Sequence, residues 1–357
     1  MGNHYRIAVL PGDGIGKEVM PEGLRTLRMG EKKTASFHMT FDFYPWGSDT
    51  FLDTGRMMPE DALKILKEYD SIYFGAVGLP EKIPDHITLW KFILPIRQGF
   101  DQYINLRPIR LLPGLRGSLR DKGPADIDFV VIRENTEGEY SGAGGRVHIH
   151  SDQEVAVQTN IFTRTGTERV LRYGFELARK RRKKLISATK SNACQFSMVF
   201  WDEVYDQIKS VYPEILAEKC HIDALAARFV THPETLDVVV ASNLFGDILS
   251  DLGGALQGSL GLAPSANLNP EKKFPSLFEP VHGSAPDIAG KMIANPIAMI
   301  WAGSLMLDFL GESEAATLVM RGIDTTVLQG KVLTPDLGGK ASTTQVGQVI
   351  SEQIEQF

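Results

Sequence analysis

Hydrophobic and polar positions along the first hundred residues predict strands that alternate with helices. Apolar runs typical of strands are found at Arg6–Leu10, Phe37–Tyr44 and Ser71–Gly75, and helical spacing is found from Lys17 towards Met29 and over Pro59–Tyr69. Strands and helices in this order are typical of an α/β fold with a parallel sheet.

The middle of the chain has a different pattern. Between Arg107 and Gly145 the predicted strands are linked by Gly/Pro-rich turns, and Val155–Thr163 alternates apolar and polar positions like an antiparallel strand. We therefore predict a second lobe. Further strand–helix units follow, with strands at Leu185–Ala188, His221–Asp223 and Val238–Val240, helices ending near Arg182 and over Phe196–Val211, a loop over Gly258–Pro275, and C-terminal helices at Pro296–Leu310, Glu314–Leu328 and Thr343–Ile354.

Two aspartates follow the strand Val238–Val240. The sequence from Phe245 has helical spacing, so Asp247 and Asp251 lie one turn apart on one helix face. Like charges at this spacing repel by a few tenths of a kcal/mol, and a cation between them would relieve the repulsion. The pair therefore indicates a Mg²⁺ or Mn²⁺ site. The alternative is that both carboxylates are solvated surface groups.

Polar residues also follow the other predicted strands. Arg133, Lys190, Asp223 and Asn243 each lie at or just beyond the end of an apolar run. Because ligands of open α/β sheets bind beyond the carboxyl ends of the strands, we expect these side chains to converge on one site.

Three arginines lie in apolar or proline-flanked surroundings, where a guanidinium needs an anionic partner: Arg97, Arg107 and Arg133. They fit a di- or tricarboxylate ligand, and structural ion pairs with Glu134 or Asp101 are the alternative. Lys190 is a candidate base and Tyr140, in a glycine-flanked loop, a candidate acid.

Composition limits the class of partner. The 357 residues are 43% hydrophobic and 23% charged with a formal net charge of −6, which argues against nucleic acid or a membrane surface as partners. The basic block 179–184 (RKRRKK) is interpreted as a solvated helix end. The two cysteines have no metal or redox spacing, which predicts reduced thiols and a cytoplasmic location.

The glycine-rich turn after the first strand does not match the dinucleotide-binding fingerprint. Gly12, Gly14 and Gly16 give the spacing G-x-G-x-G instead of G-x-G-x-x-G. We interpret this segment as a tight turn.

The motifs together resemble those of the metal-dependent β-decarboxylating dehydrogenases, the family of isocitrate, 3-isopropylmalate, tartrate and D-malate dehydrogenases. The resemblance rests on LPGDGIGKEV, RQGFDQYINLRP, VIRENTEGEYSG, TKSN, NLFGDILSDL and EPVHGSAPDIAGKMIANP, which cover the chain from end to end. It implies a two-lobed, isopropylmalate dehydrogenase-like α/β fold with a mixed, mostly parallel sheet that is not the common Rossmann fold. It also implies a discontinuous cofactor-binding domain (1–100 plus 259–357) and a substrate and dimerisation domain (101–258) with an antiparallel arm near 145–165.

The resemblance also implies a role for individual residues. The metal would be held by Asp223, Asp247 and Asp251, and substrate carboxylates by Arg97, Arg107 and Arg133, with Lys190 as general base and Tyr140 as general acid. NAD would be bound by a loop and nearby residues comprising His282, Gly283, Ser284, Ala285, Asp287, Ile288, Asn295 and Asn192. It further implies a homodimer in which Asp223 and Lys190 reach the neighbouring subunit's site.

The implied reaction is NAD-dependent oxidative decarboxylation of a small 2-hydroxy dicarboxylic acid. On an α-helix running up to Arg97, Trp90, Ile93 and Leu94 would share the arginine's face and line the pocket. The indole would fill space there, which favours D-malate or tartrate over 3-isopropylmalate, the alternative substrate. A non-catalytic metal- or anion-binding protein is the alternative of a different class.

Overall fold

The computed structural model describes residues 2–357, and the chain forms two compact units. The first unit contains the N-terminal part up to Gln102 together with Arg110–Pro124 and Gly254–Phe357, and the second contains Tyr103–Ile109 and Ala125–Gly253. Residues Arg110–Pro124 group with the first unit, although they lie within the stretch 101–258 predicted for the second. The assignment of cofactor binding to one unit and substrate binding to the other stays a prediction.

The first unit contains a mostly parallel sheet with the strand order β2-β1-β3-β12-β11. Its first four strands run parallel to their neighbours, and β11 pairs antiparallel with β12. The strands are β1 (Asn3–Gly12), β2 (Phe37–Phe43), β3 (Ser71–Ala76), β11 (Pro264–Leu268) and β12 (Ser276–Pro280). The prediction of a loop over 258–275 was therefore wrong in part, because β11 begins at a proline within it. A proline at the first position of a strand is tolerated, but it hides the strand in the sequence pattern.

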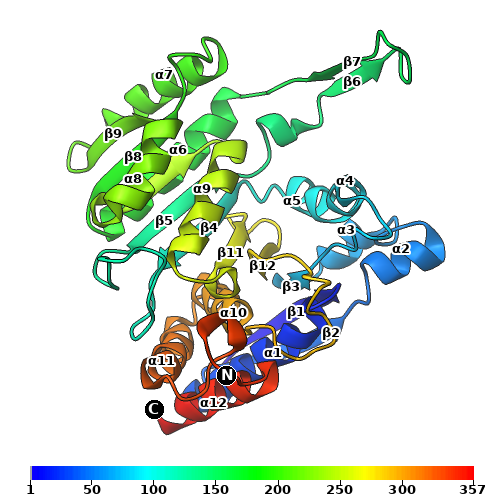
Figure 1. The fold of residues 1–357 in the computed structure, drawn as a ribbon, viewed down its shortest axis with the longest axis vertical. Coiled ribbons are helices and arrows are strands. Elements are labelled where there is room, and N and C mark those ends of the chain that lie inside the picture. Colours follow the sequence, from blue (N-terminus) through cyan, green and yellow to red (C-terminus); the bar gives the residue numbers. More distant parts are fainter. Residues whose placement is uncertain (1) are drawn as a thin grey trace. The chain divides into compact units, whose positions relative to one another are not determined.

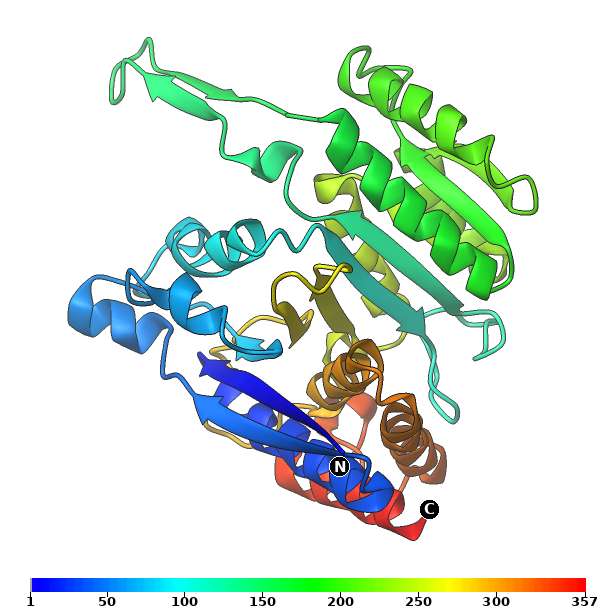
Figure 2. The same cartoon turned by 180° about the vertical axis from the view of Figure 1, so that it is seen from behind.

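Helices cover both faces of this sheet. They are α1 (Gly16–Thr34), α2 (Ser48–Thr54), α3 (Ala62–Leu66), α4 (Asp85–Thr88), α5 (Leu94–Gly99), α10 (Ile297–Leu310), α11 (Ser313–Gln329) and α12 (Thr343–Gln356). Successive residues of β3 show the two faces, since the Tyr73 hydroxyl donates to the Met299 carbonyl in α10 while Phe74 packs edge-on against Phe92. Figures 1 and 2 show α1, α10, α11 and α12 gathered together, away from α2–α5. A strand buried on both faces reads as a continuous apolar run, which is why the sequence revealed it.

The second unit contains strands in the order β4-β5-β10-β8-β9. Strand β10 runs parallel to β5 and β8, and β8 runs parallel to β9. The elements are β4 (Ile104–Arg110), β5 (Asp128–Glu134), β8 (Lys184–Thr189), β9 (Leu216–His221), β10 (Val238–Ala241), α6 (Arg164–Lys180), α7 (Ser197–Lys209), α8 (Ile222–Thr231) and α9 (Asn243–Leu256). The strand predicted at His221–Asp223 was wrong, because β9 ends at His221 and α8 begins at the next residue.

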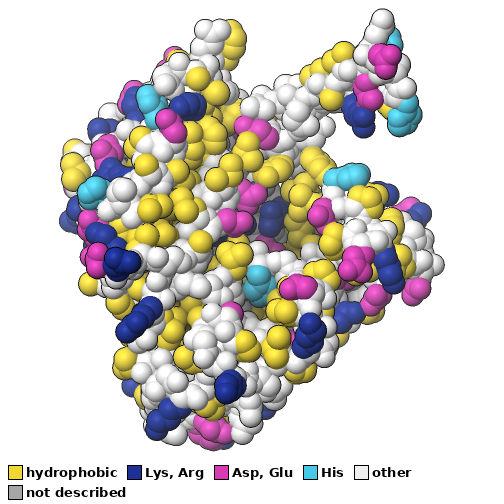
Figure 3. Space-filling view, in the orientation of Figure 1, with side chains coloured by type: hydrophobic (Ala, Val, Ile, Leu, Met, Phe, Trp, Pro, Cys, Tyr) yellow, Lys and Arg dark blue, Asp and Glu magenta, His cyan; other side chains and the backbone are white. Residues whose placement is uncertain are grey.

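An antiparallel arm extends from the second unit. It consists of β6 (Gly144–Val147) and β7 (Val155–Gln158), which pair only with each other. Figures 1 and 2 show it projecting away from the sheet of its unit. The side chains of both strands are exposed, including Val147, Val155 and Val157. Figure 3 shows hydrophobic side chains along the arm and charged and histidine side chains at its tip.

A buried carboxylate explains the basic block RKRRKK. The Asp237 side chain is fully buried and accepts hydrogen bonds from Arg181 Nε at 2.8 Å and from the amides of Arg182 at 2.9 Å and Lys184 at 3.2 Å. Arg181 also reaches the half-exposed Asp128 at 3.0 Å. The block therefore joins the end of α6 to the sheet. None of the helices within residues 2–357 has the length and apolar character that crossing a membrane requires.

We predict that Asp237→Ala lowers the free energy of unfolding by about 3–5 kcal/mol, because it leaves the Arg181 guanidinium without its buried partner. The matched control is Asp128→Ala, which removes the exposed partner of the same arginine and should cost less than about 1 kcal/mol. Urea unfolding midpoints of the two variants measure the difference. Equal midpoints would refute the structural role of Asp237.

Candidate functional site

Strand register brings the predicted polar residues to one edge of the second unit's sheet. Ala241 of β10 lies opposite Arg133 of β5, and Thr189 of β8 lies opposite His221 of β9. All four strands are linked by parallel pairing through β10 and β8, so their carboxyl ends meet at the same edge. Lys190, Asp223 and Asn243 directly follow these ends.

Asp247 is the centre of a cluster at this edge. One carboxylate oxygen, Oδ1, accepts from Arg133 Nη1 and lies 3.4 Å from Arg107 Nη1, and the other accepts from the Tyr140 hydroxyl at 3.1 Å. Arg133 Nε also donates to Asn243 Oδ1 at 2.9 Å. The side chains of Arg133 and Arg107 are buried, with exposures of 4% and 7%. Because water cannot solvate these guanidiniums well, the Asp247 carboxylate is needed to balance their charge.

A glycine in α9 makes this cluster possible. A Cβ atom at Gly246 would lie 2.6 Å from the Arg133 Cβ, so any other residue would push α9 away from β5. The neighbouring Asp247 therefore reaches the arginine only because position 246 lacks a side chain.

Arg107 lies between the two predicted metal carboxylates. Its Nη1 atom is 3.4 Å from Asp247 Oδ1 and 3.5 Å from Asp251 Oδ1, and it donates to Ser250 Oγ at 2.6 Å. The expected repulsion between the aspartates is thus already offset by a cation of the chain. Burial raises the pKa of Asp251, as does the nearby Asp247, while Arg107 opposes both.

The loop that carries Tyr140 is fixed by two glutamates. Glu134 accepts from the Thr136 amide at 2.9 Å and the Glu137 amide at 2.8 Å, and Glu137 accepts from the amide and hydroxyl of Thr163, which caps α6. These bonds fix the turn in front of Tyr140. Burial raises the pKa of the Tyr140 hydroxyl, and the charge of Asp247 raises it further, so Tyr140 keeps its proton at neutral pH.

Lys190 and Asp223 form a second pair at the same sheet edge. Lys190 Nζ donates to Asp223 Oδ1 at 2.6 Å, and this bond lowers the pKa of the Asp223 carboxyl. The Asp223 side chain is 68% exposed. Asp223 lies in the first turn of α8, and Lys190 in the turn after β8.

The aspartates have the donor chemistry of a divalent-metal site but do not form a complete one. Carboxylate oxygens suit Mg²⁺ or Mn²⁺. The Asp251 side chain is 61% exposed, so it can bind a cation from solvent. Within residues 2–357, however, no group of three or more His, Cys, Asp or Glu side chains is arranged to hold a metal ion. Asp223 therefore does not join Asp247 and Asp251 within one chain, and the three-carboxylate site stays a prediction.

Arg97, in the first unit, has a buried partner that the sequence did not reveal. Its Nη2 atom lies 2.8 Å from Glu279 Oε1, and both side chains are less than one tenth exposed. Glu279 also accepts from Asn267 Nδ2 at 2.6 Å. Of the partners expected for the three arginines, Asp101 is near Arg97 in sequence, whereas Glu279 is 182 positions away.

A π-helical turn changes the predicted pocket face. The helix leading to Arg97 contains such a turn at Leu89–Ile93, between α4 and α5. A π-turn holds one residue more than an α-turn, so the α-helical spacing that placed Trp90 on the face of Arg97 does not apply, whereas Leu94 and Arg97 lie in the same α-helix, which Ile93 directly precedes. Ile93 packs into the apolar core of the first unit and Leu94 is buried, while Trp90 is 38% exposed.

The predicted cofactor loop borders a cavity in the first unit. The cavity has a volume of about 430 Å³ and is mostly apolar, and its lining residues are Ile15, Ser259, Leu260, Gly261, His282, Gly283, Ala285, Ile288, Ile293, Ala294, Asn295, Pro335 and Asp336. Burial lowers the pKa of His282, so its imidazole is neutral near pH 7. Its buried Nε2 atom has no hydrogen-bond partner within residues 2–357. A mostly apolar cavity with an unpaired ring nitrogen fits an adenine-type group.

The remaining loop residues have distinct surroundings. Ser284 is buried and Asp287 is exposed, while Asn295 donates from Nδ2 to Asp336 at 3.0 Å. Asp336 also accepts from Ser259 at 2.6 Å, so it fixes one wall of the cavity although the sequence did not single it out. Asn192 belongs to the second unit, where it is exposed beside Lys190, and it does not line this cavity.

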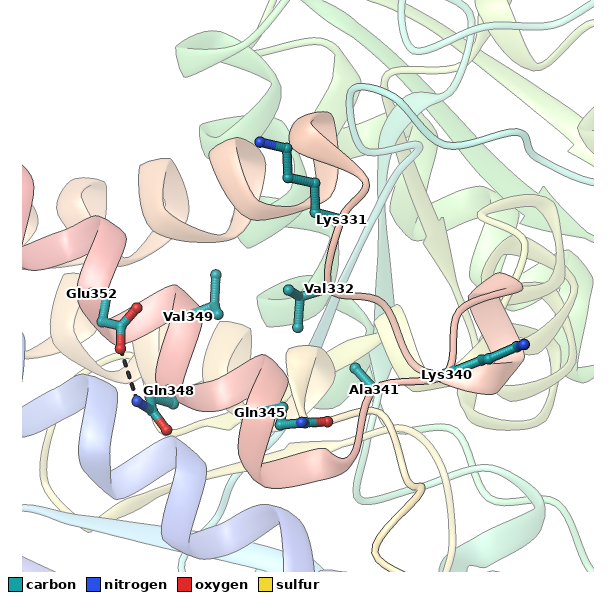
Figure 4. Close-up of a pocket in the computed structure, with 8 residues that line it drawn as sticks. All are labelled: Lys331, Val332, Lys340, Ala341, Gln345, Gln348, Val349 and Glu352. Carbon is teal, nitrogen blue, oxygen red and sulfur yellow. Dashed lines mark hydrogen bonds between the residues drawn. The ribbon is translucent and has the colours of Figure 1, made fainter.

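A second hollow of about 450 Å³ in the first unit contains none of the predicted residues. It lies over α12 and is lined by Lys331, Val332, Lys340, Ala341, Gln345, Gln348, Val349 and Glu352 (Figure 4). Its one bond between lining side chains joins Gln348 and Glu352 at 2.8 Å. We assign it no ligand.

Comparison with known proteins decides the family. The model of the isocitrate/isopropylmalate dehydrogenase family matches residues 6–350. The chain belongs to this family. It is 54% identical over 358 residues to a tartrate dehydrogenase/decarboxylase of Pseudomonas putida and 55% identical over 356 residues to a decarboxylating D-malate dehydrogenase of Escherichia coli K12, with 98% of both chains covered in each case.

A solved structure shares the fold. The crystal structure of isocitrate dehydrogenase from Methylococcus capsulatus superimposes with a TM-score of 0.89 at 32% identity, covering 99% of this chain and 100% of the other. The predicted α/β fold of this family, with a mixed and mostly parallel sheet, is confirmed.

We predict that Asp247→Asn is much more destabilising than Asp251→Asn. Asp247 is the charge partner of two buried guanidiniums, so its loss should cost about 3–5 kcal/mol. Asp251 is largely exposed and should cost less than about 1 kcal/mol. Denaturant midpoints without added metal test the difference. A more stable Asp247→Asn protein would mean that repulsion between the aspartates outweighs the two arginine contacts.

Proposed function

We propose that this protein is an NAD- and divalent-metal-dependent enzyme that oxidatively decarboxylates a small 2-hydroxy dicarboxylic acid, D-malate or tartrate. The observation that carries the proposal is the cluster of Asp247 with Arg107, Arg133 and Tyr140, which combines a metal-binding carboxylate, two carboxylate-binding cations and a proton donor. The choice of substrate is supported by the relatives named for tartrate and D-malate, which match the chain almost from end to end.

The metal site would be completed by a second copy of the chain. Asp247 and Asp251 supply oxygen ligands, and the exposed Asp223 of a neighbouring subunit would supply the third. Exposed apolar side chains on the arm and on α8 and α9 support such a homodimer, among them Val147, Val157, Val230 and Ile248. Exposed apolar residues of this kind are typical of interfaces between subunits.

The side chains of the cluster have complementary tasks in the proposed reaction. Arg107 and Arg133 hold a substrate carboxylate, and Tyr140 donates a proton to C3 after CO₂ has left, while Lys190 of a neighbouring subunit, which lies outside this cluster, takes the proton of the C2 hydroxyl. Asp247 and Asp251 would hold the metal, which when bound would supply Lewis-acid polarisation of the substrate, and the loop from His282 to Ile288 would hold NAD, which would supply the hydride acceptor. The raised pKa of Tyr140 keeps its hydroxyl protonated at neutral pH, as a proton donor requires. The role of Arg97 in carboxylate binding stays a prediction.

The experiment that tests the function is a panel of substrates assayed by NAD reduction with Mn²⁺. We expect D-malate and tartrate to have the highest kcat/KM, isocitrate to be poor and 3-isopropylmalate weak. A tenfold preference for 3-isopropylmalate, about 1.4 kcal/mol in transition-state binding, would favour this alternative substrate as the physiological one. No turnover with any member, together with metal binding, would favour the non-catalytic alternative.

Trp90, which is 38% exposed, is predicted from the sequence to limit the size of the substrate, although the π-turn removes the α-helical spacing that placed it on the face of Arg97. Trp90→Ala should raise the kcat/KM ratio of 3-isopropylmalate to D-malate severalfold, because each methylene newly accommodated contributes about 0.8 kcal/mol. The matched control is Lys91→Ala on the same π-turn, whose ammonium lies 5.5 Å from the Phe51 ring. An unchanged ratio in Trp90→Ala would remove Trp90 from the specificity pocket.

The cofactor is predicted to be NAD and not NADP. Asp287 is exposed in the cofactor loop, where its carboxylate would repel a 2′-phosphate, and Ile288 offers that phosphate no donor. Asp287→Lys combined with Ile288→Tyr should shift the ratio of kcat/KM values towards NADP. A parent enzyme that uses both cofactors equally well would contradict the prediction.

A further inference from the structure

The glycine turn that follows β1 lies against the predicted cofactor loop. Gly14 has a φ of +51°, and a Cβ atom there would lie 2.1 Å from the carbonyl oxygen of Ser284. The next residue, Ile15, donates its amide to the same oxygen at 2.9 Å. The turn thus touches the loop directly through its backbone, which only a glycine at position 14 permits.

The turn itself is held in place from its other side. Asp13, buried to 4% exposure, accepts from the amide and hydroxyl of Ser48 at 2.8 and 2.5 Å and from the amide of Gly78 at 2.9 Å. A carboxylate with three donors is a fixed group, so the turn is a rigid support for whatever packs against it.

Glu18 ties the far end of the same loop to the start of α1. Its Oε1 atom accepts the amide of Gly290 at 2.5 Å, six positions beyond Ser284. The side chain is 9% exposed, and its Oε2 atom has no hydrogen-bond partner within residues 2–357. A buried carboxylate with one unmet oxygen is costly, and the bond from the Gly290 amide offsets part of the cost of burying Glu18.

We propose that Glu18 is a positioning residue for NAD, which acts by holding the segment Ser284–Gly290 in its binding conformation. Ile15 fixes one end of the segment and Glu18 the other, and Asp287 and Ile288 lie between the two attachments. Neither Gly14 nor Glu18 lines the cavity, so their effect on NAD is exerted through the loop. This inference rests on the proposed binding of NAD by the loop.

Glu18→Leu removes the acceptor and is expected to raise KM for NAD about tenfold, with KM for D-malate changed less than twofold. Glu18→Gln keeps an amide oxygen at Oε1 and should retain most of the parent affinity. The matched control is Glu22→Leu, which removes another buried glutamate one turn along α1 that pairs with Arg25 instead of the loop. Glu22→Leu should lower thermal stability and leave KM for NAD unchanged.

A glycine pair provides an independent test of the close contact. Gly14→Ala should raise KM for NAD because its methyl group displaces the Ser284 carbonyl. Gly55→Ala is the control, since Gly55 also has a positive φ, +76°, but no atom lies within 4 Å of the added methyl group. Both variants carry the backbone strain, and only Gly14→Ala disturbs the loop.

Hydrogen exchange without NAD separates this inference from the proposed function. The Gly290 amide should exchange at least tenfold faster in Glu18→Leu than in the parent and in Glu22→Leu. Unchanged exchange and unchanged KM for NAD in Glu18→Leu would overturn the inference. Faster exchange in a protein whose parent neither binds nor reduces NAD would overturn the proposed function, and the positioning role with it.

Discussion

The candidate site depends on the need of two buried guanidiniums for a charge partner. Arg107 and Arg133 are each less than one tenth exposed, and both reach Asp247. A buried cation without a partner costs several kcal/mol. The ion pairs with Arg107 and Arg133 therefore stabilise the fold and hold the Asp247 carboxylate in place before any ligand binds. Its second oxygen then fixes the Tyr140 hydroxyl. The Asp247 carboxylate thus orients the guanidiniums of Arg107 and Arg133 and the hydroxyl of Tyr140 together.

In both units a glycine allows two segments of the chain to pack closely against each other. Gly246 lets α9 pack against Arg133, and Gly14 lets the N-terminal turn pack against Ser284. A side chain at position 246 would push α9 away from Arg133, and a side chain at position 14 would push the N-terminal turn away from Ser284. The glycines of the N-terminal turn therefore have a structural explanation that does not require direct phosphate binding.

The sequence predicted much of the site because strand ends are visible in an apolar pattern. Arg133, Lys190 and Asn243 lie at or just after the ends of buried apolar strands. Parallel pairing brings the carboxyl ends of these strands together, and it does so irrespective of the segments that connect them. Asp247 and Asp251 were found through helical spacing, which the α9 helix preserves.

The missed features depend on long-range packing or on an irregular helix. Glu279 and Arg97 are 182 positions apart, and nothing near either residue signals the pair. Strand β11 begins at a proline, and the π-turn at Leu89–Ile93 interrupts the α-helical spacing between Trp90 and Arg97. A π-turn has no composition of its own, so α-helical spacing was applied where it does not hold.

Exposure separates the three aspartates that are predicted to bind a metal into two kinds. Asp247 is 34% exposed and engaged by two arginines and a tyrosine, whereas Asp251 and Asp223 are 61% and 68% exposed. An engaged carboxylate is well placed but has little freedom, while exposed carboxylates can turn towards an incoming cation at small cost. In the proposed site, Asp247 would set the position of a metal ion and the other two aspartates would complete its coordination. Within residues 2–357 Asp223 does not join the other two in a group arranged to hold a metal ion, so its part in the site stays a prediction.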